Sequence, residues 1–405
     1  MEAPRSAFRH PAYRAYWIAK LTATFAVQII SVAVGWQVYS HTHDALDLGL
    51  IGLVQFLPSL ALVLVTGAVA DKFNRRSIMT LCLVAECLCC LLLIGMTWNG
   101  LPRVWPVFAV LTAFGVARAF YGPATSSLLP NIIPAEDLSG AIAMSTSAWQ
   151  AATIVGPVAG GLLYGISVYA AYGTALVMLG LAVLMTLLIP RPRQIITHQP
   201  SGLSELLAGF RYVWHEKVVL GAISLDLFAV LLGGATALLP IYALDILHAG
   251  PEALGMLRAA PGIGAIAMAL WLSRYPVRDH AGLVMFGFVL LFGFFTVLFG
   301  LSTVIWLSIF ALALMGAADM VSVYVRETLL QLWTPDALRG RVSAVNNVFV
   351  GASNELGEFR AGTVAALIGA KAAVMMGGLG TMAVAGLWAA LFPALRKARH
   401  LTGRV

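Results

Sequence analysis

The chain has 405 residues, of which 60% are hydrophobic and 11% are charged. An ordinary soluble domain carries about 25% charged residues, and no soluble core of this length could bury so much apolar side chain. The formal net charge of +7 does not indicate nucleic-acid binding, because the basic residues separate apolar runs and form no stripe. The composition therefore predicts an integral membrane protein.

Apolar runs long enough to cross a bilayer recur along the whole chain, and each is near or above the roughly 20 residues that a spanning helix needs. They predict an all-α membrane fold with twelve transmembrane helices, at 14–40, 46–70, 77–98, 104–127, 138–166, 168–189, 218–244, 252–273, 281–300, 303–325, 341–369 and 372–393. The N-terminal segment runs straight into the first span without a small-residue cleavage site, which predicts an uncleaved first helix.

The basic residues of the loops predict the orientation in the membrane. Cytoplasmic loops carry an excess of Lys and Arg, and one set of loops here holds Arg103 and Lys371 alone. The termini and the other loops hold Arg5, Arg9, Arg14, Lys72, Arg75, Arg76, Arg191, Arg193, Arg211, Lys217, Arg274, Arg278, Arg339, Arg341, Arg396, Lys397, Arg399 and Arg404. We therefore expect a multi-pass protein of the bacterial inner membrane with both termini in the cytoplasm.

The longest connection divides the chain into two halves of similar size. Apolar residues from Leu203 to Trp214 recur in it at helical spacing, which favours an amphipathic surface helix over a plain linker. The predicted organisation is an N-terminal six-helix bundle at 1–190, a cytoplasmic loop with a surface helix at 191–217 and a C-terminal six-helix bundle at 218–405.

The two halves resemble each other in the loop that follows the fourth helix of each half. Leu128-Leu129, Pro134 and Gly140 recur as Leu329-Leu330, Pro335 and Gly340. The Leu-to-Pro spacing is identical, and the Pro-to-Gly spacing differs by one residue. The pattern predicts a parallel duplication of six helices, the arrangement of two bundles that rock around a central site.

The chain lacks the short motifs of the common soluble chemistries. No phosphate-binding G-x-x-x-x-G-K-[ST] loop, G-x-S-x-G elbow or H-E-x-x-H pair is present. The sequence thus predicts no enzyme and no cofactor, and energy must come from an ion gradient. No metal site is expected either, because the four cysteines (Cys82, Cys87, Cys89 and Cys90) fit packing inside one apolar run. The His41, His43, Asp44 and Asp47 group fits a solvated loop better than a metal site.

A short charged segment, Gly67 to Arg76, separates the second and third spans. Gly67 removes a side chain where a neighbouring helix could pass closely, and Asp71 adds nothing to orientation and so needs a partner. The segment resembles the loop 2–3 signature of the major facilitator superfamily, G-x-x-x-D-[RK]-x-G-[RK]-[RK]. The match falls at Gly67, Asp71, Lys72, Arg75 and Arg76, with Asn74 in place of a glycine. Like glycine, Asn74 tolerates a left-handed turn. The resemblance implies that the aspartate caps the start of helix 11 and helps to latch the outward-facing state.

Further signatures agree with this resemblance, which covers essentially the whole chain. The run Arg118-Ala-Phe-Tyr121-Gly122-Pro123 resembles the fourth-helix motif, whose arginine is linked in the family to proton transfer. Gly156, Pro157, Gly160 and Gly161 resemble the fifth-helix motif of antiporters, and close packing of small residues is a second reading of the same run. The segments 8–14, 207–211 and 334–341 resemble a narrower bacterial group, the enterobactin (siderophore) exporter group, which implies export.

Ionisable residues within spans are costly, so each is a functional candidate. The candidates for proton coupling or substrate binding are Arg118, Asp226, Asp319, Glu355, Glu358 and Arg360. Glu355 and Glu358 lie on one helical face and could share a proton. Arg360 is expected to find its counter-charge in Asp226 or Asp319. The alternative for this set is a static ion-pair cluster that fixes helix packing.

The remaining ionisable residues of the spans receive less weight. Lys20, Arg258, Arg326 and Glu327 fall near predicted helix ends and are expected to extend toward the interface. Glu86 is a weaker functional candidate. Several aromatic residues could line a cavity or could equally face lipid or pack between helices. They are Trp36, Phe120, Tyr121, Phe228 and Tyr324.

Together these observations predict a twelve-helix, proton-driven exporter of a siderophore-like metabolite or a drug, working by alternating access. Its expected partners are a small-molecule substrate and the lipid bilayer, with no nucleic acid, and it is expected to be a monomer. Two alternatives stay open. The first is an importer or uniporter of a nutrient, against which the fifth-helix motif speaks. The second is a membrane sensor or enzyme without transport.

Overall fold

The computed structural model describes residues 7–101, 103–190, 203–277 and 279–398, and its regular structure in these ranges is entirely helical. Two compact units are present. The first comprises Met1–Thr42, Val54–Ser201 and Gly250–Gly255, and the second comprises His43–Leu53, Gly202–Ala249 and Met256–Val405, as far as these ranges are described. Of the connection predicted between the halves at 191–217, residues 191–202 lie outside the described residues, as do Arg5, Arg278, Arg399 and Arg404 of the basic loop set.

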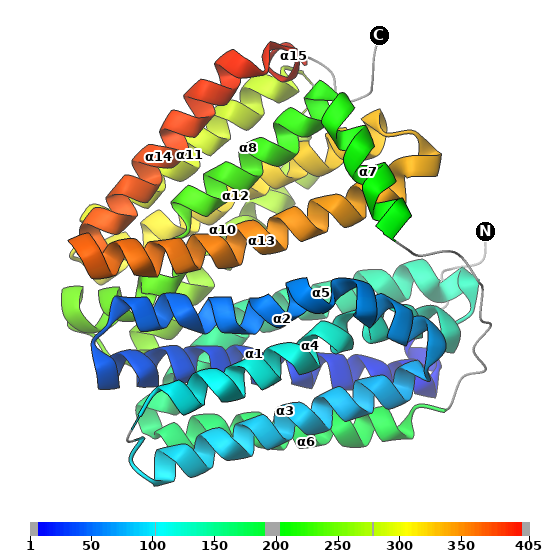
Figure 1. The fold of residues 1–405 in the computed structure, drawn as a ribbon, viewed down its shortest axis with the longest axis vertical. Coiled ribbons are helices and arrows are strands. Elements are labelled where there is room, and N and C mark those ends of the chain that lie inside the picture. The colour runs from blue at the N-terminus through cyan, green and yellow to red at the C-terminus, as the bar shows by residue number, and fades with distance from the viewer. Residues whose placement is uncertain (1–6, 102, 191–202, 278, 399–405) are drawn as a thin grey trace. The chain divides into compact units, whose positions relative to one another are not determined.

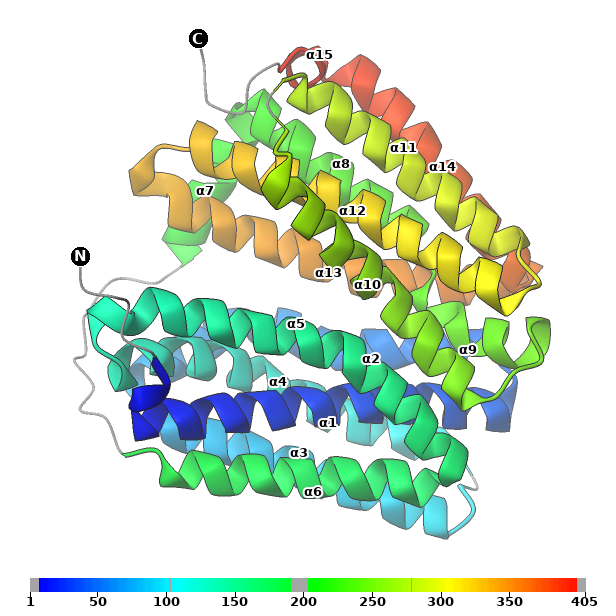
Figure 2. The ribbon, with the colours of Figure 1, turned by 180° about the vertical axis from the view of Figure 1, so that it is seen from behind.

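The first unit is built from five long helices and most of a sixth (Figure 1). Their bounds are α1 (Pro11–Thr42), α2 (Ala45–Lys72), α3 (Arg75–Trp98), α4 (Trp105–Ile132), α5 (Ala135–Ile166) and α6 (Val168–Leu188), after a 3-10 turn at Ala7–Arg9. Helix α1 packs against α5 and α6, and α3 packs against α4 and α6 (Figure 2). The N-terminal segment is tied to α5, because the Tyr13 hydroxyl donates to the Ala141 carbonyl at 2.9 Å and His10 Nε2 lies 2.9 Å from Asp137 Oδ2.

Helix caps explain where two of these helices begin. The Ser167 side chain accepts a hydrogen bond from the Ala170 N–H at 2.9 Å at the start of α6. Asn74 does the same at the start of α3, where its side chain accepts from the Ser77 N–H at 3.2 Å. Its φ of −62° and ψ of 115° are extended, so the left-handed turn considered for Asn74 is not used. An Asn in the cap position satisfies a free backbone N–H, a role that the glycine of the family signature could not fill.

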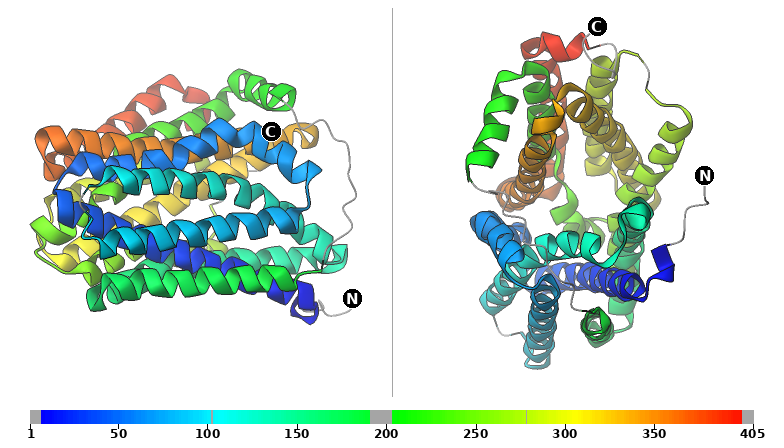
Figure 3. Two further views of the ribbon diagram at one scale, coloured as in Figure 1. Left: turned by 60° about the horizontal axis from the view of Figure 1, so that its bottom comes forward. Right: turned by 90° about the vertical axis from the view of Figure 1, so that its right-hand side faces the viewer.

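The second unit repeats this arrangement. Its helices are α7 (Leu203–His215), α8 (Lys217–Gly233), α9 (Leu239–Ile241), α10 (Pro251–Arg274), α11 (Ala281–Leu301), α12 (Ile305–Trp333), α13 (Asp336–Ile368), α14 (Ala370–Leu391) and α15 (Pro393–Arg396), with α10 counted here from Met256 onward. Helix α8 packs against α13 and α14, and α11 packs against α12 and α14, as α1 and α3 do with their partners in the first unit. Figure 3 shows the same helices from two other directions.

The packing of two glycines confirms the duplication predicted from the sequence. Gly115 on α4 lies against the backbone of Gln55 on α2, and a Cβ there would collide with the Gln55 carbonyl. Gly316 on α12 lies in the same way against the backbone of Pro261 on α10. The separation that relates Gly115 to Gly316 also relates Leu128 to Leu329. The same helix pair is therefore brought together by the same small residue in each unit.

The long helices fit a lipid environment. Ten helical segments in the described ranges are long and apolar enough to cross a membrane. The two other long helices, α5 with 32 residues and α13 with 33, carry more polar residues and occupy the same place in each repeat. On α3 the usual polarity is reversed, since Leu81 is 70% exposed while Glu86 is 1% exposed. The predicted fold class is confirmed, and the chain is a multi-pass membrane protein.

The seventh predicted span, 218–244, is not one continuous α-helix. Helix α8 ends at Gly233 and is followed by a 3-10 turn at Thr236–Leu238, by α9 and by a π-helical turn at Tyr242–Ile246. Gly233 sits where a Cβ would stand 2.5 Å from the Phe292 ring and 2.8 Å from the Thr381 hydroxyl. Two consecutive glycines and Pro240 interrupt the helix here, and the freed carbonyls need other partners.

Helix α7 belongs to the second unit. The Tyr212 hydroxyl donates to the Trp333 carbonyl at the end of α12 at 2.9 Å. Phe210 stacks on Phe349 of α13 with ring centroids 6.0 Å apart. These contacts hold the helix against the end of α12 and the N-terminal half of α13.

Candidate functional site

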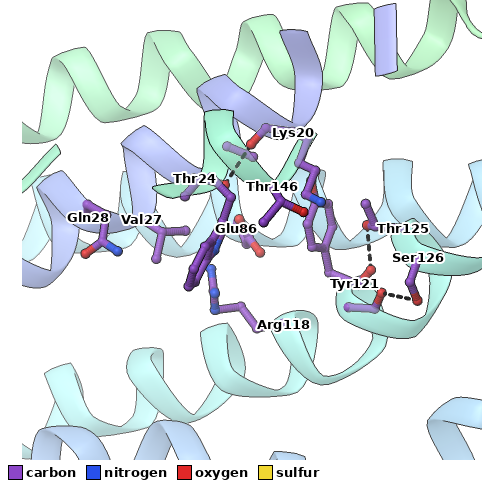
Figure 4. A pocket seen from close by; sticks show the side chains of 13 residues that line it. Lys20, Thr24, Val27, Gln28, Glu86, Arg118, Tyr121, Thr125, Ser126 and Thr146 are labelled. Carbon is purple, nitrogen blue, oxygen red and sulfur yellow. Dashed lines mark hydrogen bonds between the residues drawn. The ribbon is translucent and has the colours of Figure 1, made fainter. Parts of the chain in front are cut away.

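A cavity of about 430 Å³ lies in the first unit and is lined by α1, α3, α4 and α5 (Figure 4). This volume is in the range of small-molecule sites. Charged and hydroxyl-bearing side chains converge on it from all four helices. The lining residues include Lys20, Thr24 and Gln28 of α1, Glu86 of α3, Arg118, Tyr121, Thr125 and Ser126 of α4, and Thr146 and Trp149 of α5.

The cavity brings Arg118, a predicted site residue, together with Glu86. Figure 4 shows the Arg118 side chain extending toward Glu86, and the two charges interact. Glu86 is 1% exposed, and neither of its carboxyl oxygens has a hydrogen-bond partner among the described residues. A buried carboxyl group without a hydrogen-bond donor is rare and energetically costly, so Glu86 is a functional candidate at this cavity. Sequence reasoning gave Glu86 little weight, although an acid amid apolar residues was the available signal.

Lys20 also lines the cavity, so the expectation that it extends to the membrane interface is wrong. Helix α1 begins at Pro11, which places Lys20 in its third turn, away from the helix end. Two hydroxyls of the wall bond to their own helices, Thr24 to the Lys20 carbonyl at 2.8 Å and Thr125 to the Tyr121 carbonyl at 2.6 Å. Their oxygens keep lone pairs that can accept from a ligand.

The five predicted cavity aromatics do not gather at one place. Tyr121 lines the cavity of the first unit. Trp36 packs edge-on against Tyr164 with centroids 6.5 Å apart, and Phe228 packs against Trp388 at 5.0 Å. Tyr324 packs against the buried core of the second unit. Phe120 is half-buried on α4 and does not line this cavity. Apolar packing rather than a shared cavity places Trp36, Phe228 and Tyr324.

The basic half of the Gly67–Arg76 signature fixes the turn between α2 and α3. Arg75 Nη1 donates to the Ser127 carbonyl of α4 at 3.0 Å, and Arg76 Nε donates to the Thr186 carbonyl of α6 at 3.2 Å. Arg76 also donates to the Leu187 carbonyl, in the last turn of α6. Cations at helix C-termini satisfy orphan carbonyls and complement the helix dipole.

The other members of the signature lie at the same turn. Asp71 Oδ1 lies 3.8 Å from Arg75 Nη2, one helical turn away. The Lys72 ammonium lies 5.8 Å from the centre of the Phe73 ring. No heavy atom of the described residues lies within 4 Å of a Cβ built on Gly67, so the close helix packing expected at Gly67 is not seen.

The small residues of the fifth-helix motif make close helix contacts on two faces of α5. On one face, a Cβ at Gly156 would stand 2.6 Å from Gln28 Cβ, and one at Gly160 would stand 3.0 Å from Ile29 Cα. On the other face, a Cβ at Gly161 would stand 3.1 Å from the Cα atoms of Glu252 and Gly255. Within the first unit, the geometry of this motif is therefore that of close helix packing by small residues, the second interpretation of the sequence.

Glu355 and Glu358 of the second unit converge on one point. A Cβ built on Gly52 would stand 2.8 Å from Glu355 Oε2 and 3.2 Å from Glu358 Oε2. The Thr236 hydroxyl, in the break after α8, donates to Glu358 Oε1 at 2.9 Å. The positive charge of Arg258 acts on Glu358, so Arg258 serves this cluster and does not extend to the interface as expected. The structure thus brings together the two acids that share a helical face.

Arg360 does not pair with Asp226 or Asp319, so that prediction is wrong. Its Nε donates to the Leu231 carbonyl at 2.9 Å and its Nη2 to the Leu232 carbonyl at 2.5 Å. Both carbonyls belong to the last turn of α8 and lack intrahelical partners because the helix stops at Gly233. The sequence did not reveal that these acceptors would be free.

Asp226 instead forms an ion pair with Arg326 of α12. Arg326 is 3% exposed, and α12 continues to Trp333, so Arg326 is not at a helix end as predicted. Asp319 lies two turns earlier on α12, within electrostatic range of both Asp226 and Arg326. Glu327 lies 3.8 Å from Arg326 Nε and accepts from Asn346 Nδ2 at 2.8 Å, and its side chain stays 43% exposed. No group of three or more His, Cys, Asp or Glu side chains in the described part of the chain is placed to hold a metal ion.

Two repeats of six membrane helices, the first with a charged cavity, define a secondary transporter with the major facilitator fold. Solved structures share this fold. A variant of the nucleoside transporter NupG matches with a TM-score of 0.73 at 13% identity, over 94% of this chain and 100% of that chain. A bacterial homologue of the iron transporter ferroportin matches with a TM-score of 0.69 at 12% identity, over 97% and 100%.

The family is narrower than the fold. The model of the transmembrane secretion effector family, within the major facilitator superfamily, matches residues 2–401, and the chain belongs to this family. The enterobactin exporter EntS of Citrobacter koseri is 27% identical over 405 residues, which is 96% of this chain and 94% of that protein. EntS of Escherichia coli O157:H7 is 27% identical over 412 residues, 98% and 95% of the two chains. The protein is therefore a membrane transporter of a small molecule and not an enzyme.

Proposed function

We propose that this transporter exports a siderophore-like secondary metabolite across the bacterial inner membrane in exchange for protons, with an amphipathic drug as the next class of cargo. It works by alternating access as a monomer, with both termini in the cytoplasm. The full-length relationship to enterobactin exporters supports the direction of transport. The single observation that carries the proposal is the charged cavity of the first unit, where Arg118 and Glu86 face a volume of about 430 Å³.

Proton coupling is proposed for Glu355 and Glu358. Their carboxylates both lie beside Gly52, so two acidic groups from one helical face are brought together. Asp319 is the second candidate, because it shares the single cation Arg326 with Asp226. Asp226 and Arg360 are proposed to hold the helices in place. Asp226 already forms an ion pair with Arg326, and Arg360 already donates to the carbonyls at the end of α8.

The conformational change is proposed to depend on the two remaining motifs. Asp71 acts as a latch by capping the start of α13 in one state of the cycle. Helix α13 begins after Pro335 without a side-chain cap, and an anion is favoured at such an N-terminus by about 0.3–1 kcal/mol. Gly156, Pro157, Gly160 and Gly161 give α5 the smooth surface over which helices can shift during exchange of the bundles.

The proposal is tested by transport in everted inner-membrane vesicles with radiolabelled, iron-free enterobactin as the probe. Acidifying the lumen of everted vesicles should drive accumulation of the probe, and acidifying the external medium should not. Glu355→Gln should abolish this accumulation while the amount of folded protein stays the same. Accumulation driven by an acid external medium would indicate proton symport and hence an importer, and accumulation under neither gradient would contradict proton-coupled export of this cargo class.

A further inference from the structure

We propose that the cavity of the first unit binds the acidic group of the cargo between Lys20 and Arg118, and that Glu86 competes with this group for the two cations. The inference rests on the proposed function, because it takes this cavity to be the cargo site. It adds the chemical class of the cargo, a small molecule with an anionic group beside a flat ring, and a residue that controls its binding.

The first argument is the state of Glu86. Its side chain is 1% exposed, and both carboxyl oxygens lack a hydrogen-bond partner in the described chain. An ionised carboxylate in such a place is costly unless a cation or a donor compensates it. Arg118 is the cation that Figure 4 shows extending toward it. Glu86 is therefore either protonated and neutral, or ionised and compensated by the positive charge of Arg118.

The second argument is the charge balance around the cavity. Lys20 of α1 and Arg118 of α4 bring two positive charges, and Glu86 brings the one negative charge. The cavity keeps an excess of positive charge in either state of Glu86, so it attracts an anion and repels a cation. When Glu86 binds a proton, its own negative charge is removed and both cations are available to the anion. When Glu86 is ionised, it holds part of that positive charge itself.

Other titratable groups around Glu86 do not change this balance. Tyr121 of α4 faces the cavity, and Cys82, Cys87 and Cys89 neighbour Glu86 on α3. Helix α6, which also packs on α3, carries Tyr172, whose hydroxyl donates to Gln37 at 2.7 Å, and Tyr169, whose ring packs on Trp98. Helix α5 contributes the uncharged Thr146 and Trp149. Among the described residues that line the cavity, the charged groups are thus Lys20, Glu86 and Arg118.

The third argument is the remainder of the wall. Tyr121 and Trp149 offer aromatic surface, while Thr24, Gln28 and Thr146 offer hydroxyl and amide groups. Aromatic surface next to the two cations Lys20 and Arg118 suits a cargo with a ring that carries a carboxylate or another acidic substituent. Binding then follows a simple sequence. A hydronium ion transfers a proton to the Glu86 carboxylate and leaves as water, Glu86 no longer attracts Arg118, and the anion of the cargo binds Arg118 instead.

The test measures binding of two matched probes, 2-naphthoate and its neutral isostere 2-naphthamide, to the full-length transporter in lipid nanodiscs. The wild type should bind the acid more tightly than the amide. Affinity for the acid should be lower at the higher of two pH values, because an ionised Glu86 competes for the cations, while affinity for the amide is the same at both. A wild type that binds neither probe, or binds both equally, would overturn the proposal without any variant.

Variants identify the groups. Glu86→Gln should raise affinity for 2-naphthoate by about tenfold at the higher pH and remove the pH dependence. Arg118→Gln and Lys20→Met should weaken binding of the acid and leave the amide unchanged. Glu327→Gln makes the same chemical change on α12 of the second unit and should bind like the wild type. Unchanged or weaker binding of the acid by Glu86→Gln would sink the competition. Because the assay needs no gradient, a failure of proton-driven export in vesicles would leave its result intact.

Discussion

The ion pair between Asp226 and Arg326 offers a direct test of which acids in the second unit are structural. Asp226 is 5% exposed and Arg326 is 3% exposed, so the bilayer and the protein shield both charges from water. Removing one partner of such a buried pair leaves the other without compensation, at a cost of about 3–5 kcal/mol. Arg326→Met should therefore lower the free energy of unfolding by about that amount, because Asp226 loses its direct partner and Asp319 loses its nearby cation.

The reverse substitution should cost less. In Asp226→Asn, Arg326 keeps the charges of Asp319 and of Glu327, which lies 3.8 Å from its Nε. We expect a loss of about 1.5–3 kcal/mol, the range for a hydrogen bond to a charged group. The double variant Asp226→Asn with Arg326→Met should be more stable than Arg326→Met alone, with a coupling energy near the upper end of the roughly 0.5–3 kcal/mol seen for contacting residues.

The assay is reversible unfolding in mixed detergent micelles, followed by tryptophan fluorescence, for the wild type, both single variants and the double variant. Transport in vesicles is measured on the same set. A double variant that folds and still accumulates the probe in response to a pH gradient would show that Asp226 carries no proton in the cycle. The reasoning fails if Arg326→Met costs less than about 1 kcal/mol, or if the double variant is no more stable than that single variant.

Three further substitutions test the packing on which the site depends. Gly160→Ala would place a Cβ 3.0 Å from Ile29 Cα and push α5 away from α1, which should lower the free energy of unfolding by about 1–3 kcal/mol. The control is Gly180→Ala on α6, where a Cβ meets no described atom within 4 Å, and it should leave the free energy of unfolding unchanged in the same assay. Arg76→Ala removes the donors to the Thr186 and Leu187 carbonyls and should cost about 1–3 kcal/mol, measured against the exposed Lys72→Ala. Arg360→Met leaves the Leu231 and Leu232 carbonyls unpaired and should speed hydrogen exchange in the last turn of α8, whereas unchanged exchange there would contradict its capping role.

The sequence was sufficient for the fold and insufficient for the partners of its charges. Apolar run length, loop charge and the repeated Leu-Leu-Pro pattern predict the helices and the duplication, because each depends on local composition. The partner of Arg360 depends on where α8 breaks, and a pair of glycines inside an apolar run does not reveal that break by itself. Lys20 and Glu86 were undervalued for a related reason. A helix that is apolar on all sides gives no period from which to read its inward face.

One register relation joins the two units and yields a last prediction. The separation that relates Leu128 to Leu329 also relates Arg118 of α4 to Asp319 of α12, so the two repeats carry opposite charges at equivalent positions. Asp319 is repelled by Asp226 and attracted by Arg326, which already pairs with Asp226. Asp319→Asn removes the surplus negative charge and should change the unfolding free energy by no more than about 1 kcal/mol, in contrast to Asp226→Asn. If Asp319 binds a proton during the cycle, the same variant should transport without responding to a pH gradient. A large loss of stability would instead show that Asp319 is a structural partner of Arg326.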